Sequence, residues 1–124
     1  MIVTSVATFT MRAGREAGAL RLIRAVERQA KAEQPGTLVY LAHRTLDKKG
    51  KPTRTLYFYE RYRSGKALQR HLDSTSWKAV VSQWTTYFEG PSADSIDFFN
   101  VHRIAAFERA GSIPTVPLTR SRRP

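Results

Sequence analysis

The strand predicted at residues 55–62 has no polar face, and this feature constrains the fold more than any other. Leu56 and Phe58 alternate with Tyr57 and Tyr59, and successive side chains of a strand point to opposite faces of a sheet. Large apolar groups therefore lie on both faces. We expect helices to cover one face of the sheet and a second apolar layer to cover the other.

Turn and helix-end signals divide the chain into alternating elements. Pro35-Gly36 ends a helix whose apolar face includes Leu20 and Ile23, and Ser64 is a suitable N-cap for the next helix. The patterns predict strands at residues 2–11, 37–45, 55–62 and 97–107 and helices at 15–33, 65–73 and 76–88. This β-α-β-β-α-β order is the ferredoxin-like arrangement of the α+β class.

The chain has 124 residues, a length that fits one domain. We expect that domain to span residues 1–110. Residues 111–124 contain interior prolines and end in basic residues, which predicts a flexible tail or an arm that orders against a partner. The second apolar face predicts a homodimer in which two sheets form a shared α+β barrel with the helices outside. A partly exposed aromatic sheet is the alternative.

Composition excludes several classes of site. The chain has no cysteine, so disulfides, cysteine nucleophiles and iron–sulfur clusters are ruled out. His43, His71 and His102 lie on three separate predicted elements without ligand spacing, and we expect no metal site. No apolar run approaches the roughly 18 residues of a membrane helix, and no signal-peptide pattern opens the chain. We therefore expect a soluble, cytoplasmic protein without a membrane partner.

Several short motifs carry a resemblance to a known family. They are Tyr59-Glu60-Arg61-Tyr62, Ala67-Leu68, His71-Leu72 and Trp77-Lys78. In this order they resemble the antibiotic biosynthesis monooxygenase (ABM) domain family. The resemblance implies a dimeric α+β barrel with a cavity between sheet and helices in each subunit. It also implies oxidation of a phenolic or quinol, polyketide-like aromatic substrate by O2 without a cofactor. The haem-degrading branch is disfavoured, because the first strand lacks the asparagine which that branch needs.

The same resemblance places His71 at a matching position, as the catalytic base. A neutral histidine suits proton removal from a phenol; the alternative is a histidine that braces the contact between helix and sheet. Trp77, Trp84, Tyr62 and Tyr87 are candidate substrate-binding residues, although the same aromatic side chains could be core. Glu60 lies within an apolar strand, where an unpaired carboxylate is costly. We expect it to pair with an arginine, Arg44 or Arg103 being the candidates.

Two other functions fit parts of the sequence. A small-ligand binder, or an isomerase or cyclase, could use the same cavity without O2. An RNA-binding module shares the element order, and the net charge of +11 is compatible with it. The strand at 55–62 lacks the glycine and small-residue steps of the RNA-binding motif, and the basic residues are spread over several elements. Nucleic acid is therefore the less favoured partner.

Overall fold

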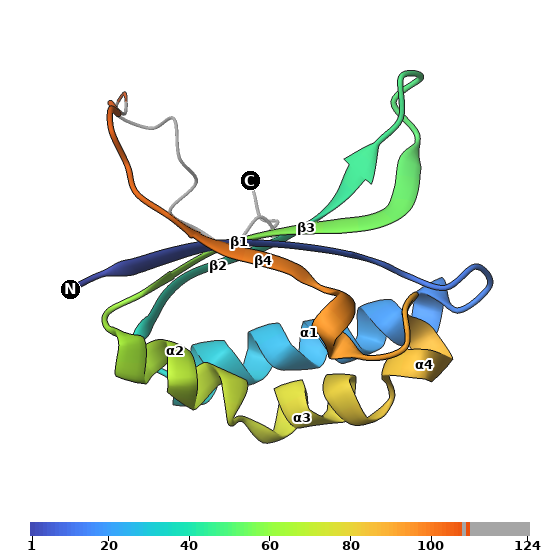
Figure 1. Cartoon of the computed structure of the whole chain (residues 1–124), viewed down its shortest axis with the longest axis horizontal. Helices are drawn as coiled ribbons and strands as arrows, with labels where there is room; N and C mark the ends of the chain where they lie inside the picture. Colours follow the sequence, from blue (N-terminus) through green and yellow to red (C-terminus); the bar gives the residue numbers. More distant parts are fainter. Residues whose placement is uncertain (108, 110–124) are drawn as a thin grey trace, which may run out of the picture.

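The described part of the chain folds into a four-stranded antiparallel sheet with its helices on one side (Figure 1). The computed structural model describes residues 1–107 and residue 109. The strands are β1 (Val3–Thr10), β2 (Thr37–Leu46), β3 (Pro52–Tyr62) and β4 (Asp97–Val101), in the spatial order β2-β3-β1-β4. The helices are α1 (Glu16–Glu33), α2 (Gly65–Leu72), α3 (Thr75–Ser82) and α4 (Trp84–Tyr87), with a short 3₁₀ turn, η1 (Ala93–Ser95). The predicted ferredoxin-like α+β class is confirmed.

The two faces of the sheet differ in what covers them. Leu56 and Phe58 of β3 are buried beneath the helices, whereas Tyr57 is 39% exposed on the other face. Phe9 of β1 stacks on Phe58 with ring centroids 4.9 Å apart. We call the helix-covered side the inner face and the opposite side the outer face. The apolar character of both faces, predicted for residues 55–62, is confirmed, and the main buried hydrophobic cluster lies against the inner face.

Helix α1 packs its predicted apolar side on the inner face. Ile23, Val26 and Ala30 are buried at helical spacing, as the 3.6-residue period requires. Gln34 caps the helix end, where its backbone N–H donates to the Ala30 carbonyl oxygen over 3.0 Å. The following Pro35 cannot continue the helix, and the predicted end at residue 33 is confirmed.

The single helix predicted at residues 76–88 is wrong, because the chain breaks at Gln83 into α3 and α4. The break redirects Trp84 into the core, where its ring lies 5.1 Å from Phe9 and 4.7 Å from Phe88. The Trp84 indole Nε1–H donates to the Glu89 carbonyl oxygen over 3.0 Å. A buried indole needs such a partner, and a continuous helix would not offer that carbonyl.

Strand β4 is shorter than predicted, ending at Val101 instead of residue 107. Val101 pairs with Thr4, and β1 itself begins at Val3. Beyond Val101, β4 has almost no β1 residue left to pair with, so the ladder ends. Residues 102–107 continue as an exposed non-strand segment. The predicted C-terminal tail, residues 111–124, lies outside the described residues. Among those that are described, no helix has both the length and the apolar character that crossing a membrane requires.

Candidate functional site

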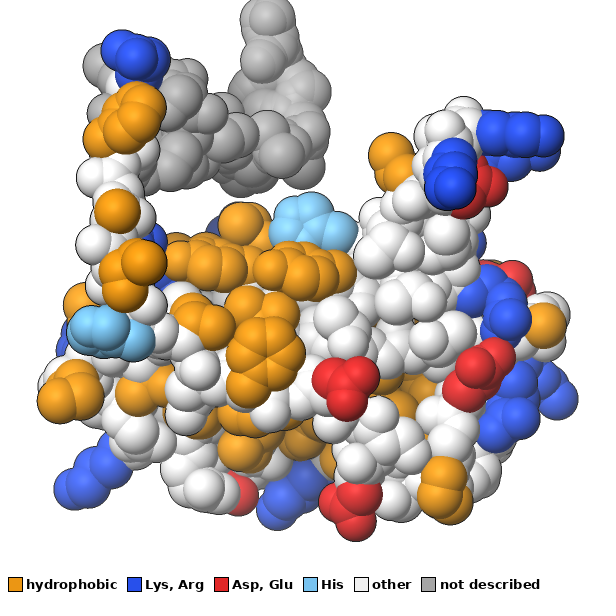
Figure 2. Space-filling view, turned by 45° about the horizontal axis from the view of Figure 1, so that its top comes forward, with side chains coloured by type: hydrophobic (Ala, Val, Ile, Leu, Met, Phe, Trp, Pro, Cys, Tyr) orange, Lys and Arg blue, Asp and Glu red, His pale blue; other side chains and the backbone are white. Residues whose placement is uncertain are grey.

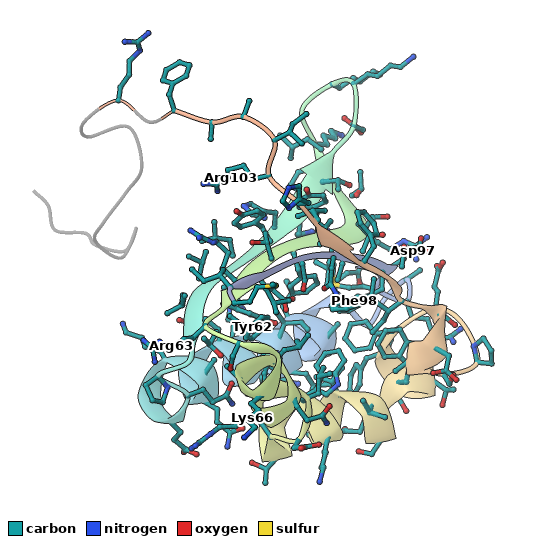
Figure 3. All side chains as sticks on the ribbon, turned by 60° about the vertical axis from the view of Figure 1, so that its left-hand side comes forward. Tyr62, Arg63, Lys66, Asp97, Phe98 and Arg103 are labelled. Carbon is teal, nitrogen blue, oxygen red and sulfur yellow. The ribbon has the colours of Figure 1, made fainter. Side chains whose placement is uncertain are left out.

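A cavity of about 440 Å³ lies between the inner face and the helices α2 and α3. Its lining is mostly apolar, and every strand contributes to it. The apolar and aromatic side chains of the lining include Phe9, Tyr40, Phe58, Trp77, Ile96 and Phe98. Figure 3 shows Phe98 on the side of β4 that faces the helices. The volume and the apolar lining are those of a small-molecule site. A few polar side chains reach the same space: His71, Glu60 and Asp94.

His71 sits in the last turn of α2 and is 3% exposed. Its Nδ1 lies 3.0 Å from Oε1 of Gln34, and that oxygen also accepts a hydrogen bond from the Thr37 hydroxyl over 3.3 Å. An amide oxygen only accepts, so Nδ1 carries the hydrogen of the neutral ring. Gln34 thereby fixes the tautomer in which Nε2 keeps its lone pair.

The free nitrogen of His71 faces the cavity. Nε2 makes no hydrogen bond within the described residues. It is nevertheless not sealed inside the protein, because part of its surface remains accessible. Because the His71 side chain is otherwise buried and lines the cavity, the cavity is where Nε2 is reached. Burial lowers the pKa of His71 from 6.5 to about 4. At neutral pH the ring is therefore an uncharged proton acceptor.

Aromatic rings hold the imidazole in place. Trp77 stacks on it at a centroid distance of 6.4 Å with an interplanar angle of 29°, and Tyr40 and Tyr62 tilt against it at 5.3 and 5.5 Å. Of the residues predicted for the site, the structure brings His71 and Trp77 together in the cavity wall. Trp77 reaches it because Ser74 caps α3, accepting a hydrogen bond from the Trp77 backbone N–H.

The other three predicted substrate-binding residues lie outside the cavity lining. Tyr62 is fully buried behind His71, where β3 runs into α2 (Figure 3). Trp84 belongs to the core described above. Tyr87 packs on α1 at Gly18, where a Cβ atom would collide with the Tyr87 ring. Tyr62 and Trp84 are buried and Tyr87 is partly buried, but the sequence could not say on which side of the cavity wall each ring lies.

The expected pairing of Glu60 with an arginine is wrong. Arg44 Nε donates to the Thr53 carbonyl oxygen over 2.8 Å, and Arg103 contacts the hydroxyl of Tyr59. Glu60 instead accepts a hydrogen bond from the Tyr62 hydroxyl, 2.5 Å from its Oε1. Burial raises the pKa of the Glu60 carboxyl, and the Tyr62 hydrogen bond offsets this only in part.

Sequence reasoning missed Gln34, Tyr40 and Phe98 as parts of the site. An apolar strand signal could have marked Phe98, because it alternates with Phe99 in the strand pattern. No sequence signal distinguishes Gln34 from other polar residues at a helix end. Its role depends on where α2 packs.

The remaining histidines lie away from the cavity. His43 on β2 has its Nδ1 3.0 Å from the Tyr57 carbonyl oxygen, and His102 follows β4 in the exposed segment. No group of three histidine, aspartate or glutamate side chains within residues 1–107 and 109 is placed to hold a metal ion.

Comparison with known sequences gives one family. The profile described as "Antibiotic biosynthesis monooxygenase" (ABM) matches residues 2–83. This range contains β1 to α3 and both His71 and Trp77. No curated protein sequence matches the chain.

Solved structures share the fold at low sequence identity. PA3566 from Pseudomonas aeruginosa is 22% identical with a TM-score of 0.68, and the match covers 84% of this chain and 95% of that one. Rv0793 from Mycobacterium tuberculosis is 23% identical with a TM-score of 0.62, covering 89% and 99%. A structure described as an antibiotic biosynthesis monooxygenase is 16% identical with a TM-score of 0.66, covering 85% and 100%. At these identities the likeness establishes the fold alone.

Proposed function

Because the chain belongs to the antibiotic biosynthesis monooxygenase family, we propose that it oxidises a phenolic or quinol aromatic substrate with O2 and no added cofactor. One observation supports this most: a neutral His71 presents Nε2 to an aromatic-lined cavity. A phenol reduces O2 far more readily once its hydroxyl is deprotonated. The protein then has to supply a base and a dry, flat-walled space.

The proposed reaction balances without an external reductant. His71 Nε2 takes the hydroxyl proton, and the resulting oxyanion passes one electron to O2, giving a substrate radical and superoxide. These combine to form a C–O bond at a ring carbon. Cleavage of the O–O bond, with protons from the ring carbon and from the His71 imidazolium, releases water and leaves a carbonyl. One oxygen atom enters the product and the other becomes water, so the substrate supplies all the electrons.

The cavity walls suit a flat aromatic substrate. Trp77 and Phe58 are among the aromatic side chains that line the cavity, and packing between aromatic rings contributes beyond the area that it buries. The apolar lining also limits water around the radical pair, which would otherwise separate before the C–O bond forms.

Oxygen consumption with 1,4-dihydroxynaphthalene tests the proposal. We expect the purified protein, treated with a chelator and freed of flavin, to consume O2 above the autoxidation blank. Labelled O2 should place one labelled atom in 2-hydroxy-1,4-naphthoquinone. Binding without O2 consumption would instead favour the ligand-binding or isomerase class, and a requirement for flavin or iron would overturn the cofactor-free mechanism.

We further propose that the protein is a homodimer through the outer face. Leu41, Tyr57, Phe99 and Val101 on this face are 39–52% exposed, which is unusual for neighbouring apolar side chains of a monomer. Figure 2 shows hydrophobic side chains gathered between two projecting arms, the β2–β3 hairpin and the segment after β4. A second copy offers a matching apolar surface by two-fold symmetry.

Val101→Asp should weaken this dimer. Two-fold symmetry buries two unpaired carboxylates, each costing about 1–3 kcal/mol, so we expect dissociation to increase at least roughly tenfold. Val81→Asp is the matched control, because Val81 is 43% exposed on α3 and Val101 is 40% exposed. Light scattering at micromolar concentration should show a dimer for the wild type and Val81→Asp and a larger monomer fraction for Val101→Asp. A monomeric wild type would refute the dimer.

A further inference from the structure

Glu60 is a second ionisable group in the cavity, and its local structure is unusual. Its carboxyl group is buried in the wall that also holds His71, and Glu60 is 7% exposed. Oε1 accepts from the Tyr62 hydroxyl. Oε2 makes no hydrogen bond within the described residues and is not sealed from the cavity. One oxygen is therefore anchored and the other faces the space where a ligand would lie.

Within the part of the chain that the structure describes, no cationic side chain pairs with this carboxyl group. The ionisable groups around it are Tyr40 from the paired position on β2, Tyr62 on its own strand and His71 from α2, and Asp94 from η1 lines the same cavity. None of these carries a positive charge at neutral pH, since His71 is held neutral. Arg61, the adjacent residue, belongs to the outer face because side chains alternate along β3. An ionised Glu60 would have no compensating partner, which is costly in a buried site.

A neutral Glu60 accounts for the different surroundings of its two carboxyl oxygens. Oε1 already accepts the Tyr62 hydrogen, so the proton of the neutral acid belongs on Oε2. Burial raises the pKa of Glu60 while burial lowers that of His71. Two groups whose pKa values are displaced in opposite directions mark an acid and a base in one site.

We propose that the protonated Glu60 carboxyl donates a hydrogen bond from Oε2 to the oxyanion of the bound aromatic, so that the site selects ligands with an ionised hydroxyl group. This inference rests on the proposed function and deepens it, because it names the anion as the form that is held. His71 removes the hydroxyl proton, and Glu60 keeps its own proton while stabilising the charge that results. An ionised Glu60 would repel the same oxygen in this weakly screened cavity.

Anaerobic binding of 4-nitro-1-naphthol, whose anion is coloured, tests the role of Glu60 without any oxidation step. Glu60→Gln keeps a donor next to the cavity and an acceptor for Tyr62, so we expect its affinity for the anion to stay within about threefold of wild type. Glu60→Leu removes the donor and should weaken anion binding roughly 10- to 100-fold. Glu60→Leu combined with Tyr62→Phe leaves no orphaned hydroxyl and guards against simple misfolding.

The pH dependence separates hydrogen-bond donation from a structural role. As pH rises through the raised pKa of Glu60, the carboxyl group loses its proton and wild-type affinity for the anion should fall, whereas Glu60→Gln should show no such fall. Tighter anion binding by Glu60→Gln than by wild type at neutral pH would overturn the inference, as would unchanged binding by a folded Glu60→Leu variant. Because no O2 is present, these outcomes are independent of whether the protein proves to be an oxygenase.

Discussion

His71→Ala is expected to lower the rate of O2 consumption by roughly 10²- to 10⁴-fold, the usual effect of losing a positioned general base. The cause is the loss of Nε2, the one ring nitrogen that faces the cavity. Initial rates with 1,4-dihydroxynaphthalene at saturating concentration measure the effect on kcat. We expect KM to change much less, because the aromatic walls that bind the ring remain.

Two further variants make this result specific. His71→Asn keeps an amide N–H that can donate to Gln34 in place of Nδ1–H, but it lacks a basic nitrogen, so it should be as slow as His71→Ala. Lys66→Ala changes an exposed residue of the same helix and should retain the wild-type rate. If folded His71→Asn keeps wild-type turnover, His71 is a brace between helix and sheet and the base lies elsewhere.

The element order could be predicted because local signals agree with it. Ser64 and Pro35 each mark a boundary that the structure keeps, and the polar turn marks the hairpin between β2 and β3, although β3 begins at Pro52 rather than at residue 55. The continuous helix at 76–88 was predicted because Trp77, Val80 and Trp84 share a helical period. Periodicity does not register a single non-helical residue, and the break at Gln83 preserves the spacing of the apolar residues on either side.

The site could be predicted only in part, because cavity walls depend on packing between distant elements. His71 and Trp77 could be found because both belong to the short motifs, His71-Leu72 and Trp77-Lys78, that carry the family resemblance. The sequence favoured a charged partner for Glu60, whereas its partner Tyr62 lies two residues on along the same face of β3. The place of Tyr40 in the cavity wall could not be found, because strand register decides it. Tyr40 stands opposite Glu60, and the β2–β3 ladder contains two irregularities, between Thr37 and Val39 and between Arg44 and Leu46. Each irregularity shifts the pairing in a way that no sequence pattern shows.

Trp84→Ala should cause the largest loss of stability. Trp84 is 2% exposed, packs on Phe9 and Phe88 and donates its indole hydrogen to a backbone carbonyl. Truncating a buried tryptophan costs about 3–5 kcal/mol, which is a large share of the roughly 5–15 kcal/mol that holds a typical domain folded. Urea denaturation at fixed protein concentration should report that loss as a lower transition midpoint with an unchanged slope.

Trp77→Ala provides the matched comparison, because it removes the same side chain from the cavity wall instead of the core. Trp77 is only partly buried, and its cavity side already lacks packing partners, so the unfolding free energy should fall by less than half as much. Its effect should appear in affinity for 4-nitro-1-naphthol, which Trp84→Ala, measured well below its unfolding transition, should leave nearly unchanged. Equal effects of both variants on binding and on stability would show that the two tryptophans are not divided between core and site.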